Sequence, residues 1–188
     1  MDLAINDPAR VSGRLTFTNF ELNCPRAREI DARLRSGHDM PERVWYSLMR
    51  ELALLCPVRT LEKRNIVVLS GRSVMARILL GDATYSGAIN YGALGTDSTA
   101  PAASDTALGA EVARKLFARR TRTDAQVNFD FFYSQLDTDG TYEEFAMFID
   151  GDASADSGQM FNHALTGGWA KTNTEAMTVS VQITINAS

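Results

Sequence analysis

The sequence predicts an α+β protein: an antiparallel, β-sandwich-like sheet domain with two or three short helices packed on it, preceded by an N-terminal arm and helix. In the C-terminal half, apolar and polar residues alternate, as in strands with one packed and one solvated face. Helical patterns precede these strands instead of alternating with them, which favours an antiparallel sheet. The length of 188 residues and the 45% hydrophobic content fit one core-forming domain with an extension. We therefore assign residues 1–57 to an N-terminal arm and helical extension, and residues 58–188 to a β-rich domain.

The extension contains one alternating segment and two helical ones. Residues 14–20 (RLTFTNF) suit a short strand, or an arm laid along another surface, with Leu15, Phe17 and Phe20 toward a core. Residues 25–35 predict a short polar helix, which needs a partner surface to stay formed. Residues 39–56 give the strongest helical pattern, with Asp39 as its cap. An apolar stripe recurs along it at spacings of three and four: Trp45, Leu48, Leu52 and Leu55.

The middle of the chain combines short strands and short helices. Residues 64–71 (RNIVVLSG) predict a strand running into a turn, and residues 70–82 predict an amphipathic helix closed by Gly81. Residues 91–94 extend another strand, and Pro101 stiffens the linker that follows. Residues 107–115 predict a short helix. Gly109 within it indicates a close approach to another backbone.

Four further segments read as strands, separated by a turn at 137–140 and a polar loop at 150–158. The strands are residues 127–134, 141–149, 159–165 and 174–188. The last is the clearest, because Met177, Val179, Val181, Ile183 and Ile185 alternate with Thr178, Ser180, Gln182 and Thr184.

Composition argues against several function classes. The net charge of −4 disfavours nucleic acid as the main partner. The longest apolar runs are only a few residues, so we expect neither a membrane span nor a signal peptide. A disulfide between Cys24 and Cys56 is compatible with the sequence, but two buried thiols are favoured. With His38 and His163, these cysteines give none of the spacings of a zinc site.

Residues 91–114 (YGALGTDSTAPAASDTALGAEVAR) look at first like a phosphate-binding loop. They match neither GxxxxGK[ST] nor GxGxxG, so we expect no nucleotide.

Acidic loops raise the question of calcium. The turn DTDG fails as a calcium loop, because Gln135 and Ala146 fall on its first and last ligand positions. Asp150, Asp152 and Asp156 are weak metal candidates, and plain turns are favoured there.

No catalytic residues are assigned. His163 is expected to be a structural histidine, either satisfied or facing solvent. The basic run at 114–122 is read as a solvated strand face, ahead of a contact with an acidic subunit or with nucleic acid. The aromatic residues Tyr142 and Trp169, with the acidic loops, leave open a calcium- or carbohydrate-binding module.

Four segments in order resemble a recurrent family of tailed-bacteriophage virion proteins. These are residues 64–82, 89–115, 140–151 and 177–185. The family shows GR-x-x-x-A-x-x-L, then LGTG-x-T-A-P-x-x-x-D-T-x-L-x-x-E, an E-x-G-L-F-like strand and a threonine-rich terminal strand. The resemblance covers residues 58–188. This chain departs from the pattern at Asp97-Ser98, where the family often has Gly-Thr, and at residues 145–148.

The resemblance implies a virion structural protein, assembled in the host cytoplasm and placed in the tail, neck or baseplate. Capsid decoration is the runner-up, and a calcium- or carbohydrate-binding fibre module is a third alternative. The expected partners are copies of itself and other virion proteins, with no cofactor, small-molecule substrate or catalytic activity. The assembly-motif residues are Gly71, Arg72, Gly95, Pro101, Asp105, Thr106, Leu108 and Glu111.

Overall fold

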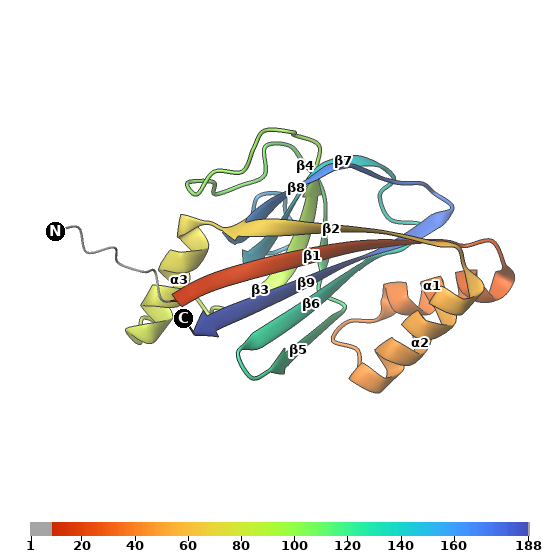
Figure 1. Ribbon diagram of the computed structural model, residues 1–188, viewed down its shortest axis with the longest axis horizontal. Coiled ribbons are helices and arrows are strands. Elements are labelled where there is room, and N and C mark those ends of the chain that lie inside the picture. Colours follow the sequence, from red (N-terminus) through yellow and green to blue (C-terminus); the bar gives the residue numbers. More distant parts are fainter. Residues whose placement is uncertain (1–8, 188) are drawn as a thin grey trace.

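The computed structural model describes residues 9–187 as three helices and nine strands. The helices are α1 (Pro25–Ser36), α2 (Glu42–Leu55) and α3 (Leu69–Leu79). The strands are β1 (Ala9–Glu21), β2 (Val58–Val67), β3 (Ile89–Gly95), β4 (Glu111–Leu116), β5 (Arg119–Thr123), β6 (Gln126–Tyr133), β7 (Gly140–Ile149), β8 (Gln159–Lys171) and β9 (Glu175–Ala187). They form one antiparallel sheet in the order β4-β3-β7-β8-β2-β1-β9-β6-β5. This sheet curls into a half-barrel (Figure 1).

The expected β-sandwich is not confirmed, because β2 joins what would have been two sheets. Residues 58–65 of β2 pair with β1, whereas Ile66 and Val67 pair with β8. The strand therefore passes from one half of the sheet to the other, and the two halves face each other across a common core without separating. β1 lies between β2 and β9, so residues on both sides of position 57 share this sheet.

The inner faces of the two halves form the main core. Leu15 and Phe17 of β1 are fully buried, as the alternation predicted. The ring of Phe145 on β7 meets those of Phe17 and Phe131 edge-on, with centroids 6.0 and 5.8 Å apart. The predicted faces of β6 and β9 are also correct, although Ile185 at the end of β9 is 46% exposed.

Helices α1 and α2 pack against the outer face of the half that contains β1, β9 and β6, at one end of the sheet (Figure 1). Phe20 and Phe132 point away from the main core and meet the helices. The Trp45 ring on α2 contacts Phe132 edge-on at 6.3 Å. The apolar side chains of α2 and of the strands around this contact form the surface against which the polar helix α1 packs. Such a surface is needed to keep a short polar helix formed.

The predicted cap of α2 is wrong. The helix begins after Pro41 without a side-chain cap. The Asp39 carboxylate instead lies 3.7 Å from the Arg120 guanidinium on β5. Leu55, the last member of the predicted stripe, is 37% exposed because the helix ends there, whereas Trp45, Leu48 and Leu52 are buried.

Both cysteines are free thiols, and both lie among the apolar residues between α1, α2 and the sheet. The Cys24 sulfur accepts a hydrogen bond from the Ala27 N–H at 3.4 Å, at the start of α1. Burial raises the pKa of the Cys56 thiol, which keeps that group protonated and inert.

Helix α3 lies at the opposite end of the molecule (Figure 1). Gly81 closes it with φ +74°, as predicted. Gly71 brings α3 against β8, since a Cβ atom there would lie 2.6 Å from the Phe161 carbonyl oxygen.

The helix expected at 107–115 does not form. Residues 96–110 are a loop, and the chain then enters β4 at Glu111. Leu108 is buried with Ala93, Ala146 and Phe148 on the outer face of the sheet. Its helical spacing from Val112 was a coincidence, because Val112 is half-exposed on an edge strand.

Replacing Gly71 by alanine should destabilise the protein by about 1–3 kcal/mol, because the new methyl group overlaps backbone that cannot rotate away. Chemical denaturation measures this change, and Ser73→Ala at an exposed position of the same helix is the control. Equal stability of the two variants would show that α3 does not pack this closely on β8.

Candidate functional site: the carboxylate–histidine cluster beneath the 96–110 loop

A buried cluster of one histidine and two carboxyl groups lies on the outer face of the half of the sheet that contains β4, β3, β7 and β8 (the second half-sheet). Its members come from β7 (Glu144), β8 (His163) and the loop (Asp105). The Nδ1 atom of His163 is 2.7 Å from Asp105 Oδ2, and Nε2 is 3.0 Å from Glu144 Oε2. Glu144 is 1% exposed and His163 is 5% exposed. The cluster therefore joins two strands to the loop that covers them.

Glu144 also holds the backbone of the loop. Its carboxylate accepts hydrogen bonds from the N–H groups of Ala110, Gly109 and Asp97, at 2.9, 3.1 and 3.3 Å. Gly95 leaves room for this carboxylate, since a Cβ atom there would lie 2.2 Å from Glu144 Oε1. Charged acceptors make the stronger hydrogen bonds of proteins, so these contacts fix both ends of the loop.

Short-range contacts shape the loop between those ends. Asp97 Oδ1 accepts hydrogen bonds from the Thr99 N–H and hydroxyl, at 2.9 and 2.8 Å. These bonds hold the pKa of Asp97 below its usual range. Asp105 accepts the Ala102 N–H at 2.8 Å. The Leu69 N–H at the start of α3 reaches the Ala103 carbonyl at 2.7 Å, so the loop is also tied to the helix.

Glu111, the last of the assembly-motif residues, forms a second buried contact. Glu111 and Arg114 on β4 are each 3% exposed in their side chains and make a two-bonded ion pair, at 2.6 and 2.8 Å. The Arg114 guanidinium lies 4.6 Å from the Phe148 ring centroid and donates to the Ser157 hydroxyl at 2.6 Å. Glu111 accepts the Asp156 N–H at 3.1 Å. This pair anchors the 150–158 loop to the sheet.

The contacts of His163 favour a structural role over proton transfer. Each of the two nitrogens is occupied by a carboxylate and faces no open site. His163 is therefore a satisfied structural histidine, one of the two forms expected from the sequence.

Most of the assembly-motif residues make packing or polar contacts within the fold. Gly71 and Gly95 allow close packing, Asp105 and Glu111 make buried polar contacts, and Leu108 is in the apolar cluster. Pro101 is half-buried, while Arg72 and Thr106 are exposed. Most of these positions therefore shape the fold, and of the eight only Arg72 and Thr106 are exposed.

Sequence reasoning missed Glu144 as the centre of the cluster. A signal was present: in the period of two along β7, Glu144 shares a face with Ala146 and Phe148. A carboxylate in line with buried apolar residues indicates a buried acceptor that needs donors.

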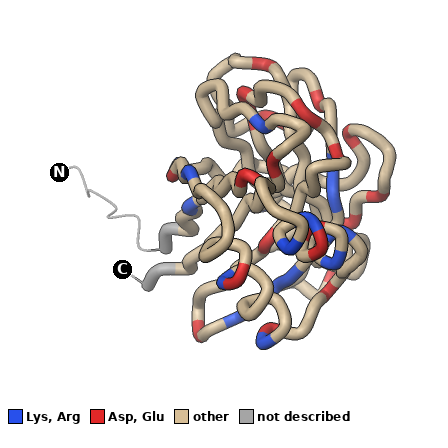
Figure 2. The backbone as a smooth tube through the Cα atoms, turned by 90° about the vertical axis from the view of Figure 1, so that its right-hand side faces the viewer, with Lys and Arg blue, Asp and Glu red and all other residues tan. Residues whose placement is uncertain are grey.

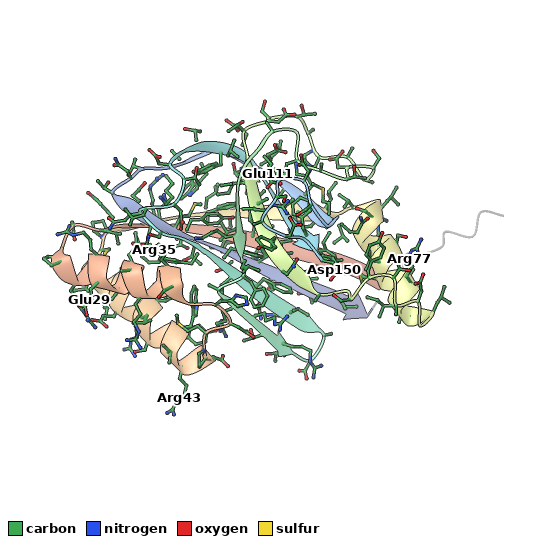
Figure 3. All side chains as sticks on the ribbon, turned by 180° about the vertical axis from the view of Figure 1, so that it is seen from behind. Glu29, Arg35, Arg43, Arg77, Glu111 and Asp150 are labelled. Carbon is green, nitrogen blue, oxygen red and sulfur yellow. The ribbon has the colours of Figure 1, made fainter. Side chains whose placement is uncertain are left out.

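The acidic metal candidates are turned toward separate partners. Asp150 accepts the Ser86 N–H at 2.7 Å, and Asp152 accepts the Ser154 N–H at 2.7 Å. Figure 3 shows Asp150 toward the α3 end of the sheet, away from Glu111. Within residues 9–187, no three His, Cys, Asp or Glu side chains are arranged to hold a metal ion.

The aromatic candidates are engaged in the fold. Tyr142 is 1% exposed. The Trp169 ring packs against Phe17 at 6.5 Å and lies under the Arg59 guanidinium at 4.6 Å, while its N–H donates to Asn19 at 2.8 Å. Neither ring offers the open face that a sugar needs for stacking.

The basic run at 114–122 is only partly a solvated face. Arg114 and Arg119 are buried in ion pairs, whereas Arg120 and Arg122 are exposed. Acidic residues outnumber basic ones along the loops at the top of Figure 2. The run thus divides into structural and surface arginines.

Comparisons with family models, with curated proteins and with solved structures give no match. None of the helices among residues 9–187 is long and apolar enough to cross a bilayer.

Substituting Glu144 by glutamine should lower the free energy of unfolding by about 2–3 kcal/mol. The neutral amide is a weaker acceptor for three backbone N–H groups, and it leaves the His163 ring with one carboxylate fewer. Thermal denaturation measures the loss, and limited proteolysis should show faster cutting within 96–110. Glu143→Gln, at the adjacent half-buried position, should change stability by less than about 0.5 kcal/mol. Comparable losses in both variants would contradict the role given to Glu144.

Proposed function

We propose that this protein is a structural subunit of a tailed-bacteriophage virion, in the tail, neck or baseplate region, and that it acts by assembling with copies of itself and with other virion proteins. The observation that carries the proposal is the resemblance of four ordered segments to that family. Three of the four meet around one cluster: α3 packs on β8 through Gly71, the 96–110 loop is held by Glu144, and Glu144 lies in the third segment. A motif whose parts build a single unit supports a shared fold more strongly than isolated matches do.

Exposed apolar side chains support an assembly role. Leu79 and Leu80 at the end of α3 are 88% and 86% exposed, and the neighbouring Ile78 is 45% exposed. Adjacent large apolar side chains in contact with water indicate a surface that is covered by another protein. The exposed motif residue Arg72 lies on the same helix.

The alternatives differ in measurable ways. A capsid decoration protein would be present in many more copies per particle than a tail or neck component. A calcium-binding fibre module would melt at a higher temperature with calcium than with chelator, since a ligand stabilises the folded state that binds it.

Antibodies against the protein should label purified virions in electron micrographs at the tail or neck, and quantitative mass spectrometry should give a copy number well below that of the major capsid protein. Labelling over the whole capsid would favour decoration. Absence of the protein from the particles would overturn the proposal.

Replacing both Leu79 and Leu80 by serine should leave the free energy of unfolding within about 1 kcal/mol of the parent, because both side chains are exposed. Incorporation into particles, measured by immunoblotting of virions, should fall sharply. Leu54→Ser on α2, where the leucine is 79% exposed, is the matched control and should be incorporated normally. Normal incorporation of the double variant would remove the end of α3 from the assembly surface.

A further inference from the structure

The outward side of α2 carries two arginines without a partner. Arg43 and Arg50 lie about two turns apart on the helix and line one shallow groove with Tyr46, which is 55% exposed. Neither guanidinium forms a hydrogen bond or an ion pair with any residue between positions 9 and 187. Figure 3 shows Arg43 pointing away from the sheet. This side of the helix therefore presents positive charge to the surroundings of the molecule.

The carboxylates of α1 and α2 do not balance these arginines, because they are paired with other cations. Glu51 lines the same groove, but Arg26 donates to both of its carboxylate oxygens, at 2.6 and 3.1 Å. Arg26 also contacts Glu29 at 2.9 Å. At the other end of α2, Glu42 contacts Arg119 at 3.0 Å. The surplus charge on the outward side of α2 is thus positive.

The opposite charge is concentrated in two loops. Residues 96–110 and 150–158 contain five aspartates and no lysine or arginine. The first loop leads into β4, and the second adjoins it there, because Glu111 accepts the Asp156 N–H at 3.1 Å. Asp152 and Asp156 are exposed, and among the described residues neither carboxylate is in an ion pair. These loops therefore present negative charge.

The two charged surfaces cannot neutralise each other within one molecule. In Figure 3 Arg43 lies on the opposite side of the molecule from Glu111, which marks the start of β4 and the loops beside it. Complementary surfaces on opposite sides of one chain can meet only between copies. Such a contact is heterologous, so it repeats head to tail and builds a ring or a filament.

A second copy suits these surfaces better than a nucleic acid does. A nucleic acid would be attracted by the arginines but repelled by the aspartates and by the net charge of −4. The acidic loop of another copy neutralises the arginines and is itself neutralised in the same contact. Tyrosine and arginine, exposed side by side on α2, are also residue types that are enriched in protein–protein interfaces.

We propose that copies of this protein associate head to tail, with the side of α2 that carries Arg43 and Arg50 facing Asp152 and Asp156 of the next copy. The contact specifies how copies meet in the proposed virion subunit, and it rests on that function for its use in the particle. It is separate from the exposed end of α3. Exposed ion pairs contribute up to about 1 kcal/mol each and are screened by salt. The contact is therefore weak between free copies and becomes effective where several copies are held together.

Sedimentation equilibrium of the full chain tests the contact. In about 20 mM salt the weight-average mass should rise above that of the monomer as the protein concentration approaches about 1 mM, and about 0.5 M salt should return it to the monomer. The double variant Arg43→Glu/Arg50→Glu should stay monomeric at low salt. The double variant Arg64→Glu/Arg122→Glu makes the same change in net charge at exposed strand positions. It is the matched control and should associate as the parent does.

Exchanging the charges separates a specific contact from a general effect of charge. The double variant Asp152→Lys/Asp156→Lys should also stay monomeric by itself. Mixed with Arg43→Glu/Arg50→Glu, it should associate again, because every contact in the mixture joins opposite charges. A parent that stays monomeric at low salt, equal association of the parent and the arginine variant, or a mixture that does not associate would overturn the proposal. Binding of a DNA duplex that the arginine variant loses would overturn the choice of partner.

The virion role has its own readout. Labelled virions together with a parent that stays monomeric would remove only the head-to-tail contact. Association in solution by a protein that is absent from the particles would remove only the virion role.

Discussion

The buried carboxylate of Glu144 constrains the whole outer layer of the second half-sheet. An ionised carboxylate away from water costs several kcal/mol unless donors surround it. Here three backbone N–H groups and the His163 ring provide those donors. The chain from 96 to 110 must therefore run where its N–H groups reach Glu144, and the residues that follow, 111–116, pair with β3 instead of forming a helix. Gly95 next to the carboxylate follows from the same requirement.

The two outer faces of the half-barrel are covered in different ways. The 96–110 loop covers one face, with Leu108 and Phe148 buried between loop and sheet, whereas Val74 of α3 packs into the main core. On the other face α1 and α2 reach only part of the surface, and polar side chains remain along β1, β9 and β6. The covered face is thus part of the packed fold, while polar side chains line the partly open one. The end of α3, with the exposed Leu79 and Leu80, belongs to neither face.

Much of the secondary structure could be predicted from the sequence, and the errors have identifiable causes. The apolar stripe of α2 and the alternation in β6 and β9 are strong local patterns, and most of their predicted faces are correct. Asp39 has the residue type of a cap, but its carboxylate lies near Arg120 of a distant strand. The spacing of Leu108 and Val112 matched a helix, yet the pairing of residues 111–116 with β3 outweighed that preference. In both cases a residue far along the chain competes with a local propensity.

The sequence by itself determined which side of each well-patterned strand would be buried, because a period of two is a local property of the chain. It also determined that the strands of the C-terminal half follow the helices, and it contains the motif that resembles virion proteins. Only the tertiary structure decided that a single curled sheet forms, since this depends on Ile66 and Val67 of β2 pairing with β8. It alone brought His163 to Asp105, a partner 58 residues away. Such pairings depend on the packing of the whole chain, and no local pattern encodes them.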